Sequence, residues 1–151
     1  MRLTSRHSTV LIADDHTMVR KRLVELLTEH GLTVVGAVSD GHMLIDAASR
    51  LRPDVIVTDI SMPPGLSGLE VLARLKTAGV DSKVILLTMH NDMDVATLAL
   101  RAGASGFLLK HAAGDELVDA IHQVLQGRVY FPPTLSREVT ERPVPPDSSD
   151  E

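Results

Sequence analysis

The chain alternates short apolar runs with longer segments in which apolar residues recur at helical spacing. The runs have the length and aliphatic composition of β-strands, and they are Val10–Ala13, Leu32–Val38, Val55–Thr58, Val84–Leu87 and Gly106–Leu109. The other segments carry the apolar stripe of amphipathic helices, and these stripes run through Val19–Leu27, Leu44–Leu51, Leu69–Leu75, Val95–Ala102 and Leu117–Leu125. The pattern predicts five strand–helix units in succession.

The predicted strands are too apolar to leave one face in water. Continuous apolar strands that alternate with amphipathic helices are typical of a parallel sheet covered by helices on both sides. The expected helix ends are marked by glycines, which adopt a left-handed conformation easily, and in one case by a proline. The first, third, fourth and fifth helices are expected to end at Gly31, Gly79, Gly103 and Gly127, and the second at Arg52-Pro53.

Four of the five predicted strands lead into a polar residue suited to binding phosphate or metal. These residues are Asp14 and Asp15, then Asp59, Thr88 and Lys110. In an open parallel sheet, ligands bind outside the carboxyl ends of the strands. If the four strands are neighbours, three carboxylates, one hydroxyl and one ammonium converge on a single pocket.

Crowded carboxylates in such a pocket require a proton or a cation to relieve their repulsion. Carboxylate oxygens suit Mg²⁺, which usually takes few protein ligands and completes its shell with water and phosphate oxygens. A carboxylate can attack phosphorus to give an aspartyl phosphate, and the charge on the phosphoryl oxygens must then be neutralised. Asp59 is the candidate acceptor, with Mg²⁺, Lys110 and Thr88 each serving one phosphoryl oxygen.

The composition is that of a soluble globular protein, and it excludes several classes of function. The 151 residues favour one domain, and a net charge of -5 argues against a body that grips nucleic acid or an anionic membrane. No cysteine is present, so thiol and disulfide chemistry are excluded. The start has no apolar signal core and no stretch is long enough to span a bilayer, so we expect a cytoplasmic protein.

We expect three parts along the chain. Residues 1–8 form an N-terminal tail and residues 9–128 the folded domain. Residues 129–151 turn proline-rich and then acidic, with nothing to bury, so we expect a linker or disordered tail and no effector domain.

Five motifs in order make residues 8–128 resemble the receiver domain of a two-component response regulator. They read Leu-Ile-Ala-Asp-Asp-His at 11–16, Val-Thr-Asp-Ile-Ser-Met-Pro at 57–63, Leu-Leu-Thr-Met-His at 86–90, Arg-Ala-Gly-Ala-Ser-Gly at 101–106 and Phe-Leu-Leu-Lys at 107–110. The first, third and fourth most resemble receivers of the NarL/FixJ (LuxR-type) subfamily. The resemblance implies a flavodoxin-like (CheY-like) α/β fold, a doubly wound five-stranded parallel sheet of order 2-1-3-4-5 with five helices.

The resemblance assigns a metal role to four positions. It implies that Mg²⁺ is bound directly by Asp15 and largely through water by Asp14, with Asp59 and the backbone carbonyl of Ser61 as further metal-binding positions.

The resemblance also assigns the phosphorylation chemistry and the switch. Asp59 would be the phosphoacceptor, Lys110 would pair with the phosphoryl group, and Thr88 would move toward it. Phe107 occupies the place of the aromatic residue that turns inward when Thr88 moves, which alters the surface of the fourth helix, fifth strand and fifth helix. The implied protein is a switch and not an enzyme, apart from its own Mg²⁺-dependent phosphorylation and dephosphorylation.

Two departures from the family pattern lie next to the predicted site. The loop Pro63–Gly68 carries one extra residue, which leaves the register of Asp59 and Ser61 intact, and Lys110 is followed by His111 instead of proline. Ser61, Met89 and His90 are candidate modulators of the site, Met89 because it replaces a small residue and would narrow access to Asp59. His16 adjoins the acidic pair and is expected at the rim of the pocket.

The implied partner is a sensor histidine kinase, with a homodimer formed on phosphorylation as a further expectation. Transcription would be controlled through a DNA-binding domain outside these residues. The alternatives are a stand-alone receiver or a pseudo-receiver that acts by protein–protein contact alone. An aspartyl-phosphate phosphatase of the haloacid-dehalogenase-like class is disfavoured, because it carries a second aspartate where Ser61 stands here.

Overall fold

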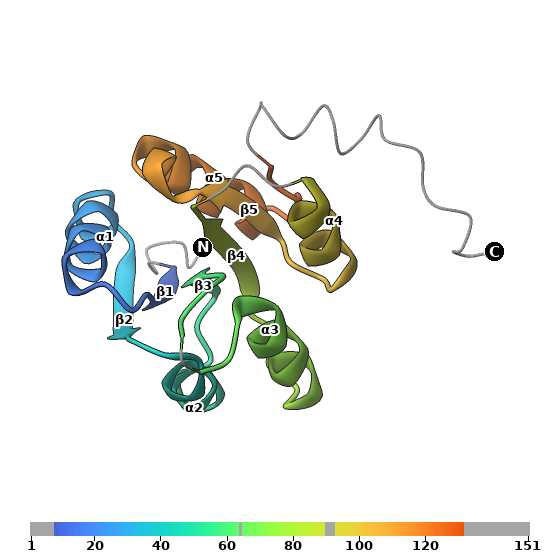
Figure 1. Cartoon of the computed structure of the whole chain (residues 1–151). Helices are drawn as coiled ribbons and strands as arrows, with labels where there is room; N and C mark the ends of the chain where they lie inside the picture. Colours follow the sequence, from blue (N-terminus) through green and yellow to red (C-terminus); the bar gives the residue numbers. More distant parts are fainter. Residues whose placement is uncertain (1–7, 64, 90–92, 132–151) are drawn as a thin grey trace.

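Five parallel strands form one sheet in the computed structural model, which describes residues 8–63, 65–89 and 93–131. The strands are β1 (Thr9–Ala13), β2 (Thr33–Val38), β3 (Val55–Asp59), β4 (Lys83–Thr88) and β5 (Gly106–Leu109). Their order across the sheet is β2-β1-β3-β4-β5 (Figure 1). The predicted fold class and strand order are therefore confirmed, and each strand lies within two residues of its predicted bounds.

The helices cover both faces of the sheet, as the apolar strands predicted (Figure 1). The five α-helices of the described residues are α1 (Thr17–Glu29), α2 (Gly41–Leu51), α3 (Gly68–Thr77), α4 (Met93–Arg101) and α5 (Asp115–Leu125), and a 3₁₀ turn, η1 (Lys110–Ala112), precedes α5. Side chains of α1 and α5 share one apolar cluster with the sheet, while those of α2, α3 and α4 share the other. Strands β1, β3, β4 and β5 alternate between the two clusters residue by residue, because successive side chains of a strand point to opposite faces.

Strand β2 departs from the prediction that both faces of every strand are covered by helices, because part of it is exposed to solvent. Thr33 and Ala37 are exposed, and the other residues of β2 are only partly buried. β2 is an edge strand that pairs with β1 alone. An apolar sequence run does not reveal whether its strand lies at the edge of the sheet, so this prediction was wrong for β2.

The predicted helix ends are confirmed by the backbone. All four of the glycines expected to end helices have positive φ angles, between 74° and 98°. Helix α2 ends at Arg52, which adopts the left-handed conformation with φ 48° just before Pro53. The Arg52 side chain donates a 2.8 Å hydrogen bond to the carbonyl of Gly79, two residues after α3, and so links the two helix ends.

The folded body continues beyond the boundary predicted at residue 128. Tyr130 is buried and forms a parallel bridge with Gly106 of β5, and Phe131 packs against the cluster on the other side of the sheet. At the other end, Ser8 belongs to the sheet edge, because its carbonyl accepts a hydrogen bond from the backbone of Thr33. Residues 1–7 and 132–151 of the predicted tails lie outside the described residues. No helix in the described part of the chain is long and apolar enough to cross a membrane.

Candidate functional site

The register of the sheet brings the polar strand ends together. Ala13 of β1 pairs with Thr58 of β3, so the residues that follow, Asp14 and Asp59, lie side by side. Strand β4 is the other neighbour of β3, and its last residue, Thr88, pairs with Leu109 just before Lys110. The structure therefore unites the predicted residues at the carboxyl edge of the sheet, as the parallel topology requires.

Lys110 joins the two buried carboxylates of the site. Its Nζ lies 2.8 Å from Oδ2 of Asp59 and 2.9 Å from Oδ2 of Asp14, and the lysine side chain is only 7% exposed. Burial of the ammonium would by itself lower its pKa, but the hydrogen bond to Asp59 and the negative charges of Asp59 and Asp14 outweigh that effect, so the pKa of Lys110 is raised. The lysine is therefore a permanent cation at neutral pH.

Asp14 is fully buried and incompletely satisfied. Its Oδ1 accepts a 2.8 Å hydrogen bond from the backbone N–H of His16. Its Oδ2 has no hydrogen-bond partner among the described residues, and the Lys110 ammonium faces it without hydrogen-bond geometry. A buried carboxylate oxygen in this condition is costly unless a cation or water completes its surroundings.

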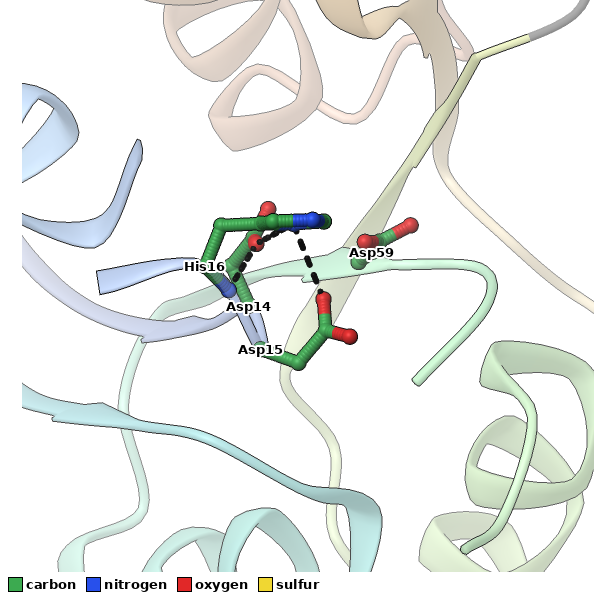
Figure 2. Close-up of side chains that lie close together, drawn as sticks. All are labelled: Asp14, Asp15, His16 and Asp59. Carbon is green, nitrogen blue, oxygen red and sulfur yellow. Dashed lines mark hydrogen bonds and ion pairs between the residues drawn. The ribbon is translucent and has the colours of Figure 1, made fainter. Parts of the chain in front are cut away.

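Asp15 and His16 form the exposed side of the site (Figure 2). The His16 Nδ1 atom lies 3.0 Å from Oδ1 of Asp15, 3.2 Å from Oδ1 of Asp14 and 3.3 Å from Nζ of Lys110. The sequence placed His16 only at the rim, whereas the structure places its ring against three predicted site residues. The one sequence feature that could have indicated these contacts is the position of His16 directly after Asp14 and Asp15.

Asp59 is held from two directions. Its Oδ1 accepts a 3.1 Å hydrogen bond from the backbone N–H of Ser61, and its Oδ2 accepts the bond from Lys110. The Ser61 residue itself is exposed. The Asp59 carboxylate is therefore fixed at both oxygens, and one of its oxygens lies within 4.8 Å of a ligand atom of Asp15.

The longer loop after Asp59 closes tightly at its far end. The Gly68 N–H donates a 2.7 Å hydrogen bond to the carbonyl of Ile60. A Cβ on Gly68 would lie 2.8 Å from Cα of Ile60 and 3.1 Å from the Asp59 carbonyl, so only glycine fits there. Leu66, in the lengthened part, packs where a Cβ on Gly41 of α2 would be.

The predicted switch residues lie on one face of neighbouring strands. Leu86 pairs with Phe107, and Thr88 lies two residues further along β4, so Thr88 shares the face of Phe107. Phe107 is fully buried and Thr88 is 5% exposed. Met89 projects into solvent with 65% of its surface exposed, and His90 lies outside the described residues.

Comparison with known proteins identifies the family. Residues 10–122 match the response regulator receiver domain. The chain belongs to this family. The receiver is 34% identical over 142 residues to the response regulator GacA of Pseudomonas aeruginosa, an alignment that covers 93% of this chain and 66% of GacA. It is 34% identical over 130 residues to the nitrate/nitrite response regulator NarL of Escherichia coli K12, covering 85% of this chain and 60% of NarL.

Solved receiver structures agree with the fold. A LuxR-family response regulator from Aurantimonas sp. SI85-9A1 superimposes with a TM-score of 0.84 at 29% identity and covers 90% of this chain and 97% of its own. The isolated receiver domain of RcsB from Salmonella enterica serovar Typhimurium, solved with the phosphomimetic BeF3⁻, has a TM-score of 0.78 at 29% identity and covers 87% of this chain and 98% of its own. The sequence relatives are longer than this chain, which spans 66% of GacA and 60% of NarL.

The donor set of the receiver fits a divalent cation. One ligand atom from each of Asp14, Asp15, His16 and Asp59 lies within 4.8 Å of the others. Three of these residues are carboxylates, which suit a hard ion such as Mg²⁺. The buried Oδ2 of Asp14, which lacks a hydrogen-bond partner among the described residues, is the structural feature that such an ion and its water would satisfy.

Proposed function

We propose that this receiver accepts a phosphoryl group on Asp59 from the phosphohistidine of a sensor histidine kinase, in a Mg²⁺-dependent reaction. The observation that carries the proposal is the position of the Lys110 ammonium, which contacts the buried carboxylates of Asp59 and Asp14 at 2.8 and 2.9 Å. Such a buried cation beside a buried carboxylate is suited to neutralising a phosphoryl oxygen in the product.

The proposed reaction transfers phosphorus between two nucleophiles. An oxygen of Asp59 forms the new O–P bond while the bond from phosphorus to the kinase imidazole nitrogen breaks, and the product is an acyl phosphate. The Ser61 N–H holds Oδ1 of Asp59 and Lys110 holds Oδ2, so the acceptor is oriented before the phosphoryl donor arrives. Lys110 and the Thr88 hydroxyl then bind phosphoryl oxygens.

Mg²⁺ would be held by Asp15, Asp59 and the Ser61 carbonyl, with Asp14 acting largely through water. When bound, it would supply charge neutralisation for the phosphoryl oxygens and for the crowded carboxylates. The protein residues provide the rest of the site: Lys110 supplies a second positive charge, and the burial of Asp59 keeps competing water away.

The proposed output is a change in the surface of α4, β5 and α5. Thr88 shares a strand face with Phe107, so a shift of the hydroxyl toward the phosphoryl group alters the space that the ring occupies. Control of transcription through a DNA-binding domain outside these residues is supported by the regulatory relatives and by a similar RcsB structure of two dimers bound to DNA. The proposal also includes dimerisation of the receiver on phosphorylation. It further includes a cytoplasmic location, where the receiver would encounter the kinase.

Intact mass after incubation with Mg²⁺ and acetyl phosphate tests the proposed function. We expect a single phosphoryl adduct that is lost in Asp59→Ala and without metal. Asp81→Asn is the matched control, because Asp81 is exposed and just precedes β4, at the opposite end of the sheet, and it should keep the adduct. A folded wild-type chain without an adduct would instead support a pseudo-receiver that binds partners without phosphorylation.

A further inference from the structure

The segment after α5, Val129–Phe131, is attached to the edge of β5 and is called here the β5 strap. The Tyr130 N–H donates a 2.8 Å hydrogen bond to the carbonyl of Ser105, and the Tyr130 carbonyl accepts a 2.9 Å bond from the N–H of Phe107. Gly106, between them, forms a parallel bridge with Tyr130. The end of the described chain is thus attached beside β5 by a single bridge, outside the five strands labelled in Figure 1.

The two aromatic residues of the β5 strap point to opposite faces of the sheet, as in a strand. Tyr130 is 8% exposed and lies in the cluster with α5, where its hydroxyl donates a 2.7 Å hydrogen bond to Glu116. Phe131 packs on the other side, against the cluster that contains α4. The β5 strap therefore packs on both faces of the sheet at its edge, and the Tyr130–Glu116 hydrogen bond links it to α5.

Phe107 contacts the β5 strap twice. Its backbone N–H is bonded to Tyr130, and its ring stacks on the Phe131 ring with centroids 6.2 Å apart and an interplanar angle of 29°. Phe107 is fully buried and shares its strand face with Thr88. Phe131 thus stacks on Phe107, which in turn lies on the same strand face as Thr88 at the proposed phosphorylation site.

We propose that Phe131 is a positioning residue that holds Phe107 in its buried position and couples the phosphorylation site to the chain beyond residue 131. The proposal rests on the proposed function. Because the buried Phe107 is the position expected when Thr88 engages a phosphoryl group, an attached β5 strap favours the phosphorylated form. Coupling of this kind is reciprocal, so phosphorylation must in turn tighten the β5 strap.

Hydrogen exchange on the wild-type chain provides the first test, with Mg²⁺ and fluoroberyllate as the phosphoryl mimic. We expect the mimic to slow exchange of the Phe107 and Tyr130 amides together. Slower exchange at Phe107 with an unchanged rate at Tyr130 would overturn the proposal. A wild-type chain that binds no fluoroberyllate and gains no adduct from acetyl phosphate would remove the proposed function itself, and this proposal with it.

Fluoroberyllate affinity of variants provides the second test. Phe131→Ala should weaken binding by about threefold to tenfold, the range that corresponds to the energy of one aromatic pair. Phe131→Tyr keeps the ring and should restore wild-type affinity. Val35→Ala is the control for general destabilisation, because Val35 is partly buried against the same cluster but lies on β2 at the opposite sheet edge, so its affinity should not change.

Two results complete the second test. Equal affinity of folded Phe131→Ala and wild type would overturn the proposal. If Phe131→Ala does not fold, Phe131→Leu replaces it, because leucine keeps apolar volume without the ring, and the same loss of affinity is expected.

Discussion

The ammonium of Lys110 lies 2.8 Å from Oδ2 of Asp59, across the carboxyl edge of the sheet, although the two residues are 51 positions apart in the chain. The same ammonium is 2.9 Å from Oδ2 of Asp14. One cation thus balances two buried carboxylates, and the charge of the site depends on it. Loss of that cation leaves the carboxylates to repel each other, which is the basis of the first prediction.

Lys110→Ala should destabilise the receiver and make its stability depend more strongly on Mg²⁺ than that of wild type. Removing one partner of a buried ion pair costs on the order of 3 kcal/mol, and a divalent cation bound by the carboxylates that Lys110 leaves uncompensated would offset part of this cost. Urea unfolding with and without Mg²⁺ measures both effects. Lys83→Ala, at an exposed position of β4, should show neither. Equal Mg²⁺ dependence in wild type and Lys110→Ala would contradict the prediction.

Tyr130 is the only tyrosine of the chain, and tryptophan is absent, so tyrosinate absorbance reports on it alone. Burial and the hydrogen bond to Glu116 raise the pKa of Tyr130. The folded receiver should therefore titrate well above the ordinary tyrosine pKa of about 10, and the urea-unfolded chain near it. Glu116→Gln should bring the folded midpoint back toward the ordinary value.

The raised pKa of Tyr130 also fixes the sign of a stability change at high pH. Below pH of about 10 both the folded and the unfolded chain keep the phenol proton, so this contribution is fully present. Above it, only the unfolded chain releases the proton, and stability falls as the pH rises toward the folded pKa. Tyr130→Phe should be less sensitive to pH in this range. Parallel curves for wild type and variant would rule out this contribution.

Gly68→Ala should destabilise the receiver by about 1–3 kcal/mol, the usual cost of overpacking. The added Cβ would meet the backbone of Ile60 at 2.8 Å, and that backbone directly follows Asp59. Phosphoryl uptake should fall as well, because the acceptor is displaced. Gly65→Ala in the same loop is the control, since the nearest atom to its Cβ is 3.9 Å away. Comparable unfolding midpoints for the two variants would refute the steric argument.

His16 should give the metal site a preference that carboxylates alone would not. Its Nδ1 lies 3.0 Å from Oδ1 of Asp15, and imidazole nitrogen suits Ni²⁺ better than Mg²⁺. Calorimetric titration of His16→Ala should show weaker Ni²⁺ binding, by roughly tenfold or more, with Mg²⁺ binding little changed. An equal loss for both ions would show that His16 serves only to hold Asp15 in place.

The sequence by itself determined the elements and the principal site residues of this protein. Strand and helix periods are local, so five βα units were readable, and the parallel sheet they implied placed Asp14, Asp59, Thr88 and Lys110 at one edge. The motifs added the strand order through the resemblance to receivers. These features follow from spacing along the chain and from the general rule that ligands bind at strand ends.

Only the tertiary structure decided the remaining features. The apolar runs did not show that β2 has a solvent-exposed side, that the His16 ring contacts Asp15, or that Tyr130 and Phe131 belong to the folded body. Each of these features depends on a partner distant in the sequence or on the direction of a side chain. Neither of these two causes produces a periodic pattern of apolar residues along the chain. Tyr130 is buried and Phe131 partly buried because the edge of β5 offers backbone hydrogen bonds and two apolar faces, and that edge exists only once the sheet has formed.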